Sequence, residues 1–347
     1  MLRTDRFHPK SLTALAAALA LAGCSFIPTY ERPAAPVAPA FAEPAASGVT
    51  PASQLKGPAA DSIEWQSFFR DERLKRLIAI ALENNRDLRV AMLNVDQLRA
   101  QYQIRRADIL PTVGLAATGQ RQPGVNDSIS SLYTVGLAVT AWELDLWGRV
   151  RSLSDAALAQ YYGSEEARKS AQISLIAAVA NTYITLLADE EQLKVTEQTL
   201  ASREESYKLS KLKFDNGAAS ALDFNLAESL LEGARVALAQ QTRLRAQDVN
   251  ALVLLLGQSL PADLPAGLSI AEQALQSDLP PGVPSEVLAR RPDVRFAEQQ
   301  LLAANANIGA ARAAFFPRIA LTASAGTAST ELSGLFKSGS FAWSFMP

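Results

Sequence analysis

Residues 133–149 read YTVGLAVTAWELDLWGR, and they join an alternating segment to the longest helical segment of the chain. In the first eight of these residues, large apolar side chains alternate with small or hydroxyl-bearing ones. Because successive side chains of a strand point to opposite faces, this period predicts a strand with one apolar face and one small, polar face. The same alternation appears at residues 113–118, 319–324 and 341–345.

Two architectures fit strands with a single apolar face. A soluble sandwich would bury that face against a second sheet, and the alternation by itself favours this simpler fold. A membrane β-barrel would turn the apolar face toward lipid, and strands of about 10 residues with a small, polar inner face also fit it. The N-terminal sequence described below favours the barrel.

Residues 149–214 contain no proline and are rich in helix-forming residues. At about 1.5 Å per residue, such a helix would be on the order of 100 Å long, which is more than a globular core can use. Apolar residues recur every seven positions here and in a second helix, and such repeats predict supercoiling around neighbouring helices. The two series are Val179, Leu186, Leu193, Leu200, Tyr207 and Phe214, and then Leu230, Ala237, Leu244 and Ala251. We expect a coiled-coil stalk or a wall of helices; an antiparallel coiled coil without a lumen is the alternative.

A turn separates these two helices within residues 213–223. Asn216 and Gly217 form a strong turn signal that ends the first helix, and Ser220 is a suitable N-cap for the second. The pair is therefore expected to form a hairpin with its tip here. Asp223 falls in the first turn of the returning helix, where a carboxylate favours the positive end of the helix dipole without any further function.

The chain resembles itself after a shift of 206 positions. The shift aligns, among others, Leu82 with Leu288, Asp87 with Asp293, Arg89 with Arg295, Arg106 with Arg312 and Pro111 with Pro317. Each copy predicts a helix of about 25 residues that ends before its proline. The counterpart of residues 142–257 would follow Pro347, so we expect that the second copy is truncated in this sequence and that the complete protein is longer.

The N-terminus has the three parts of a secretory signal peptide. Three basic residues within the first ten positions precede an apolar run over residues 12–21, which is too short to span a bilayer. Leu21-Ala22-Gly23-Cys24 then resembles the lipobox of bacterial lipoproteins. This resemblance implies cleavage before Cys24, acylation of its thiol and delivery to the outer membrane. An inert thiol in an ordinary signal peptide is the alternative.

These patterns divide the chain into four segments. We expect a signal peptide at residues 1–23 and a lipid-anchored, Pro- and Ala-rich extended arm at residues 24–62. Residues 63–260 form the first structural repeat, with a helix, two barrel strands and the long helical hairpin. Residues 261–347 contain a linker and the truncated second repeat.

Composition excludes most catalytic and metal-binding chemistry. The one histidine, His8, lies in the signal peptide, and the one cysteine is Cys24. A mature chain therefore lacks Ser-His-Asp and Cys-His catalysis and the usual zinc ligands. The carboxylate pairs Glu165-Glu166 and Glu190-Glu191 are typical of a solvated helix face, and a net charge of −2 gives no footprint for nucleic acid. We expect no enzyme, no metal and no cofactor apart from the covalent lipid on Cys24.

Four segments together resemble the TolC-like outer membrane efflux channels, in particular the lipoprotein branch typified by OprM. They are residues 142–149 (WELDLWGR), the Asn-Gly hairpin tip, residues 311–317 (ARAAFFP) and the lipobox. The similarity extends over nearly the whole mature chain. It implies a mainly α fold with β-barrel strands, in which long coiled-coil helices form a periplasmic α-barrel below a trimeric, twelve-stranded transmembrane β-barrel.

The same resemblance implies an outer membrane channel subunit of a tripartite efflux system, a passive exit duct for drugs or other small toxic compounds. The implied partners are two further copies of the chain, a periplasmic adaptor, a proton-driven inner-membrane pump and outer membrane lipid. In the family's tip motif, an aspartate six residues after the turn glycine takes part in the periplasmic gate, which matches Asp223 and Gly217. Asn216, Gly217 and Ala218 are the candidate adaptor-contacting tip. A lipid-anchored periplasmic coiled-coil scaffold without a pore is the alternative function.

Overall fold

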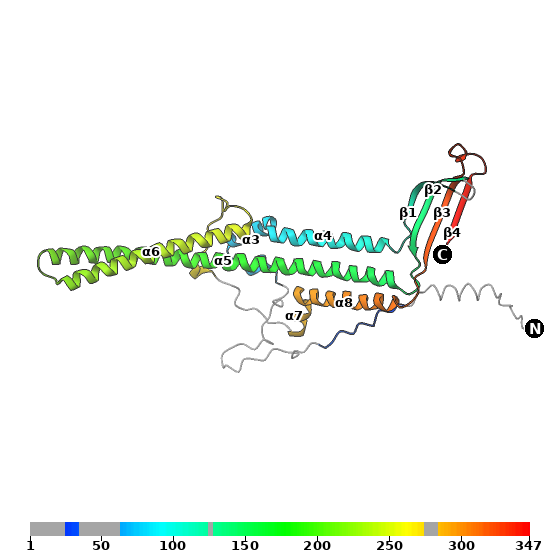
Figure 1. Ribbon diagram of the computed structural model, residues 1–347. Helices are drawn as coiled ribbons and strands as arrows, with labels where there is room; N and C mark the ends of the chain where they lie inside the picture. Colours follow the sequence, from blue (N-terminus) through cyan, green and yellow to red (C-terminus); the bar gives the residue numbers. More distant parts are fainter. Residues whose placement is uncertain (1–24, 35–62, 124–127, 274–283) are drawn as a thin grey trace, which may run out of the picture. The chain divides into compact units, whose positions relative to one another are not determined.

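The computed structural model describes residues 25–34, 63–123, 128–273 and 284–347 (Figure 1). The chain divides into two compact units, and each is described by itself. The first unit contains residues 94–165 and 295–347 together with the segment before residue 35, and the second contains residues 35–93 and 166–294. The predicted signal peptide, Cys24 and most of the predicted arm lie outside the described residues.

A four-stranded antiparallel sheet belongs to the first unit (Figure 1). In spatial and chain order its strands are β1 (Val113–Pro123), β2 (Ile129–Glu143), β3 (Ala320–Ser329) and β4 (Phe341–Met346). The alternation in the sequence thus predicted all four strands. Because β3 pairs directly with β2, the second copy of the repeat extends the sheet that the first copy begins.

The register separates apolar from small side chains. One cross-strand row consists of Leu115, Leu137, Ala325 and Trp343, and the next of Ala116, Gly136, Gly326 and Ala342. Since neighbouring rows point to opposite faces, one face is apolar and the other is small and polar. The apolar face is exposed, with Leu115 at 80% and Trp343 at 71% of full accessibility. A soluble sandwich would bury such a face, so this exposure favours the barrel.

The two helices that the repeat predicts are α4 (Arg86–Ala107) and α8 (Pro292–Ala313). Both of their ends are related by the same shift of 206 positions that aligns the sequences. Each helix ends four residues before its proline, which cannot continue a helix because it lacks a backbone N–H. The structure therefore confirms the paired helices, while the segment boundaries proposed above stay predictions.

The core of the second unit packs around α3 (Glu72–Asn84), part of α5 (Arg149–Asp215) and the end of α6 (Ala221–Leu256). Its largest fully buried side chains are Leu74, Leu77, Ile78, Val179, Tyr183, Leu252 and Leu256. The short helix α2 (Trp65–Phe68) packs against this core, and α7 (Pro284–Arg290) precedes α8. By length and composition alone α5 could cross a membrane. Val179 and Tyr183 of α5 lie in this core, while only 28% of the helix's most apolar window is buried inside the protein.

Asp71 organises the start of α3 and is only 1% exposed. Its Oδ1 accepts hydrogen bonds from the backbone N–H groups of Arg73 (2.8 Å) and Leu74 (3.4 Å). Its Oδ2 accepts three more, from the Tyr183 hydroxyl (3.0 Å), the Leu268 backbone N–H (3.1 Å) and Gln273 Nε2 (2.5 Å). Burial raises the pKa of Asp71, but these hydrogen bonds outweigh it and hold the pKa below its usual value.

Asp71→Asn should lower the free energy of unfolding by about 2–4 kcal/mol, because an amide group would face donors that now bond a charged carboxylate. The folded pKa of Asp71 is depressed, so its stabilisation is present above the unfolded pKa of about 3.9 and is lost as the pH falls through the folded value. Unfolding curves of the detergent-solubilised protein between pH 3 and 7 measure both effects.

The neighbouring Glu72→Gln is the matched control, because the Glu72 side chain is 71% exposed and pairs only with Lys75 among the described contacts. It should change stability little. An Asp71→Asn protein as stable as the unchanged protein would contradict the role given to Asp71.

The α5–α6 hairpin confirms the first part of one predicted heptad series and corrects the other series. Val179 and Leu186 are buried, as the α5 series predicts, but the later members of the series are half-buried and Phe214, at its end, is exposed. In α6 the predicted residues, which begin with Leu230, are exposed, and the seam instead includes Leu231, Ala234 and Leu252. The apolar count missed this seam because polar residues occupy its middle.

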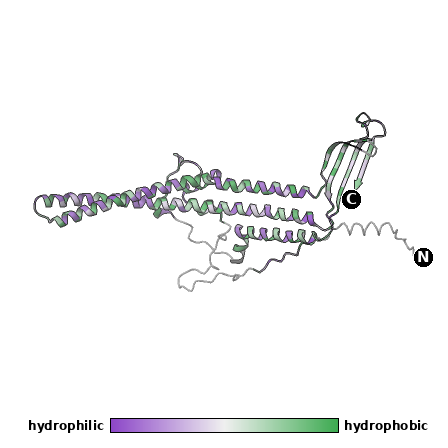
Figure 2. Ribbon diagram, in the orientation of Figure 1, coloured by the Kyte–Doolittle hydropathy of each residue, from purple (hydrophilic) through white to green (hydrophobic). Residues whose placement is uncertain are grey.

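Two contacts show how polar residues fill the seam. Arg245 pairs with Glu190 at 2.9 Å, and Gln241 Nε2 donates to the Asp189 carbonyl at 3.4 Å. Hydrophilic and hydrophobic residues accordingly mix along the whole hairpin (Figure 2).

Candidate functional site

The hairpin tip forms as the sequence predicts. α5 ends at Asp215, and the next residues turn the chain back into α6. Asn216 Nδ2 donates to the Leu212 carbonyl at 2.7 Å, and the Ala218 backbone N–H donates to the Lys213 carbonyl at 2.8 Å. Gly217 has φ = 68°, a left-handed conformation that favours glycine. Asn216, Gly217 and Ala218 are all exposed, so they are available for contact with another protein.

Ser220 and Asp223 form a reciprocal capping box at the start of α6. The Asp223 backbone N–H donates to Ser220 Oγ at 3.1 Å. In return, Asp223 Oδ2 accepts from Ser220 Oγ at 2.7 Å and from the Ser220 backbone N–H at 3.3 Å. The predicted N-cap is thus confirmed, and the candidate gate residue lies on the exposed surface of the tip.

Three aromatic rings join the two helices beside this capping box, and we call them the aromatic clasp: Tyr207, Phe214 and Phe224. Phe224 stacks on Phe214 with ring centroids 5.1 Å apart and lies 5.6 Å from the Tyr207 ring. Lys211 Nζ lies 5.9 Å from the centre of the Phe224 ring. The heptad series contains Tyr207 and Phe214 but not Phe224, so sequence reasoning missed the residue that completes the clasp.

A shallow hollow of about 270 Å³ lies between the helices next to the tip. It is lined by Arg203, Ser206, Ser210, Asp223, Leu226, Ala227 and Leu230. An exposed apolar stripe runs along the first turns of α6 and consists of Leu222, Leu226 and Leu230. Each of these residues has more than 40% of its full accessibility. The tip region therefore offers both a charged residue and an uncovered apolar surface.

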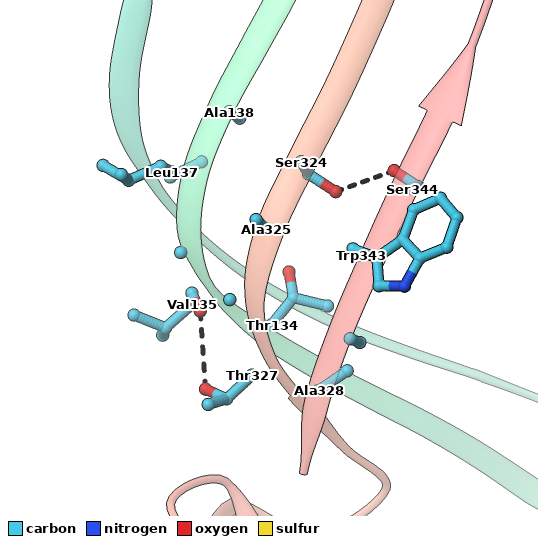
Figure 3. A pocket seen from close by; sticks show the side chains of 14 residues that line it. Thr134, Val135, Leu137, Ala138, Ser324, Ala325, Thr327, Ala328, Trp343 and Ser344 are labelled. Carbon is cyan, nitrogen blue, oxygen red and sulfur yellow. Dashed lines mark hydrogen bonds between the residues drawn. The ribbon is translucent and has the colours of Figure 1, made fainter.

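The small, polar face of the sheet is the second candidate site. Hydroxyl groups pair across its strands, Thr118 with Thr134 at 2.6 Å and Ser324 with Ser344 at 2.7 Å. Figure 3 shows the Ser324–Ser344 pair at the hollow of about 260 Å³ that this part of the sheet forms. These paired hydroxyls make a neutral surface that water can wet.

Two glycines in this face allow the strands to approach closely. Gly136 lies directly opposite Gly326 in the register. A Cβ on Gly136 would meet the Ala325 carbonyl oxygen and would come within 2.6 Å of Gly326 Cα. A Cβ on Gly326 would likewise meet the Val135 carbonyl oxygen. The two positions are 190 residues apart, so only the cross-strand register reveals the pair.

The segment that follows the predicted lipid site packs on α8. Asn305 Nδ2 donates to the Pro28 carbonyl at 2.7 Å, and Arg32 pairs with Glu298 at 3.1 Å. Gly309 makes room for this segment, since a Cβ there would lie 2.6 Å from Ile27 Cγ1. The arm is thus fastened to α8 over residues 25–34, which contain no helix or strand. Cys24 itself lies outside the described residues, and its acylation stays a prediction.

Among the described residues, no group of three or more His, Cys, Asp or Glu side chains could hold a metal ion.

A family model described as outer membrane efflux protein matches residues 77–258 and 283–347. Two similar proteins are the probable efflux pump outer membrane protein TtgC of Pseudomonas putida and the outer membrane protein OprJ of Pseudomonas aeruginosa. TtgC is 49% identical over 97% of this chain and 71% of its own length, and OprJ is 49% identical over 97% and 70%.

A similar solved structure is the open state of the Neisseria gonorrhoeae MtrE outer membrane channel. It is 44% identical with a TM-score of 0.81, and the match covers 93% of this chain and 71% of that one. The predicted TolC-like fold, with long helices and antiparallel strands, is therefore confirmed. Because these matches cover most of its length, the chain belongs to the outer membrane efflux protein family.

Proposed function

We propose that the chain is one subunit of a homotrimeric exit duct, through which an inner-membrane pump and a periplasmic adaptor expel small toxic compounds. The chain is an outer membrane efflux protein, as its family and its 49% identical relatives indicate. We further propose that protons drive the pump and that a covalent lipid on Cys24 anchors each subunit to the membrane.

The observation that carries the proposal is the two-faced sheet. Its apolar face is exposed and carries Phe341, Trp343 and Phe345, which suits contact with lipid. Its other face carries small residues and hydroxyl pairs, which suits a water-filled lumen. Sheets of several chains would have to close on one another, because unpaired strand edges cannot lie in lipid. The alternative, a periplasmic scaffold without a pore, gives the exposed apolar face no use.

The hairpin tip supports the proposed gate. Asp223 lies on the exposed surface of the tip, where symmetry-related copies would gather like charges or form interchain ion pairs around one axis. Adaptor contacts with Asn216, Gly217 and Ala218 would favour the open arrangement by binding it more tightly than the closed one. No step in this function needs bond-making chemistry, and the duct is proposed to be passive.

The cargo is proposed from the relatives. Similar proteins of Pseudomonas putida are named for the efflux of toluene and of antibiotics. We therefore propose small apolar or amphipathic compounds as cargo. Expression of the full-length protein in a strain that lacks its own exit duct, with a matching pump and adaptor, should restore the export of a fluorescent amphipathic dye. No restoration with any matched pump and adaptor would count against the proposal.

Cys24→Ser should abolish lipid attachment, because Cys24 is the only thiol in the chain. Several acyl chains add about 0.8 kcal/mol of membrane affinity for each buried CH₂, so the anchor would add to the hold of the proposed barrel on the membrane. Intact mass spectrometry of protein extracted from outer membranes measures the change, and Ser25→Ala is the matched control. A lipid-sized mass that persists in the Cys24→Ser protein would contradict the predicted acylation site.

A further inference from the structure

The carboxylate of Asp223 is already held by its own helix. Both of its described hydrogen bonds end on Oδ2, one from Ser220 Oγ at 2.7 Å and one from the Ser220 backbone N–H at 3.3 Å. An aspartate that closes a gate must direct its charge to another chain. Each hydrogen bond within the capping box therefore competes with the gate contact for the same carboxylate.

We infer that Ser220 is a positioning residue for the gate: its hydroxyl holds Asp223 in the capping box and thereby opposes closure. This inference rests on the proposed gate role of Asp223. In the open state, Asp223 bonds Ser220 in its own chain. In the closed state, the carboxylate leaves Ser220 and meets a partner on a neighbouring chain.

The local geometry allows this exchange without unfolding the tip. Ser220 Oγ also accepts from the Asp223 backbone N–H at 3.1 Å, and this bond does not involve the carboxylate. It can persist while the Asp223 side chain rotates outward, so α6 keeps its N-cap in both states. The adjacent Phe224 ring is stacked on Phe214, which fixes the first turn of α6 to the end of α5. Only side-chain torsions of Asp223 need to change.

The two pairings are also close in strength. A capping interaction and an exposed ion pair each stabilise a protein weakly, and Ser220 and Asp223 are both exposed to water here. Removal of one competitor should therefore shift the balance between open and closed states measurably. A much stronger interaction on either side would lock the tip in one state.

The test compares single-channel recordings of the full-length protein and its variants in planar bilayers. Ser220→Gly removes the hydroxyl but keeps a residue that caps helices well, so the tip should still fold. It should lower the ratio of open to closed states about fivefold, because it removes the hydrogen bond from the Ser220 hydroxyl to Asp223 Oδ2, which only the proposed open state contains. Ser220→Thr keeps the hydroxyl and should behave like the unchanged protein. Asp223→Ala should act in the opposite direction and favour the open state.

Ser206→Ala is the matched control, because Ser206 lines the hollow that Asp223 also lines, but its hydroxyl donates to the Ser202 carbonyl in α5 at 2.9 Å. An unchanged or raised open fraction in Ser220→Gly, together with opening by Asp223→Ala, would overturn the role of Ser220 and leave the gate intact. If Asp223→Ala had no effect on the open fraction, Asp223 would not belong to the gate, and the inference about Ser220 would fail as well. If Ser220 served only to cap α6, Ser220→Gly and Asp223→Ala would both weaken the capping box and would shift the open fraction in the same direction.

Discussion

A single methyl group at position 136 should strongly reduce the assembly of the sheet. In Gly136→Ala, the new Cβ would meet the backbone of Ala325 and Gly326 on the paired strand, and backbone atoms cannot rotate away as a side chain can. Forced shifts of this kind typically cost about 1–3 kcal/mol, and a barrel repeats the cost in every chain. The yield of folded, pore-forming protein should fall roughly ten- to a hundredfold.

Gly114→Ala provides a closely matched control. Gly114 lies in β1, two rows from Gly136 and on the same side of the pleat, and a Cβ there meets nothing within 4 Å. Heat-resistant oligomers on unboiled gels and the amount of protein in the outer membrane measure assembly of both variants. If Gly136→Ala assembled as well as Gly114→Ala, this result would contradict the close approach of β2 and β3 at Gly136.

Asp223→Ala should raise the conductance of the closed channel severalfold. The change removes a charge from each copy at the proposed constriction, so the interactions that narrow the pore disappear. The helix itself should persist, because Ser220 Oγ still accepts from the backbone N–H of residue 223. The recordings should show more open time without a change in the conductance of the fully open channel.

Asp215→Ala is the control for Asp223→Ala. Asp215 is also an exposed aspartate at the tip, but it pairs with Lys211 of its own helix at 3.3 Å. Asp215→Ala should leave the conductance of the closed channel unchanged. Equal behaviour of the two variants would mean that the effect comes from the net charge of the tip rather than from a gate at Asp223.

Local periodicity allowed much of the fold to be predicted. The two-residue alternation gave the four strands, the absence of proline gave the length of α5, and Asn216 with Gly217 gave the tip. Each of these signals lies within one continuous segment of the chain. The shift of 206 positions likewise matched α4 to α8 end for end.

Features that depend on distant residues could not be predicted in this way. Asp71 is held by Leu268 and Gln273, about 200 positions later, and no pattern in the sequence connects them. The seam of α6 was misplaced because Gln241 and Arg245 occupy positions where an apolar count expects leucine. Phe224 belongs to the aromatic clasp although it lies outside both heptad series, so the series did not predict its contacts. These contacts are decided by three-dimensional packing, which local spacing does not specify.

The most direct test of the account is the electrical conductance of the purified full-length protein in a planar lipid bilayer. The account predicts discrete, uniform current steps, because closed barrels of fixed size would enclose a water-filled lumen lined by the small, polar face of the sheet. Protein that carries Gly136→Ala should give few such steps or none. Correctly folded protein that binds the bilayer but produces no steps would contradict the channel and would favour the scaffold without a pore.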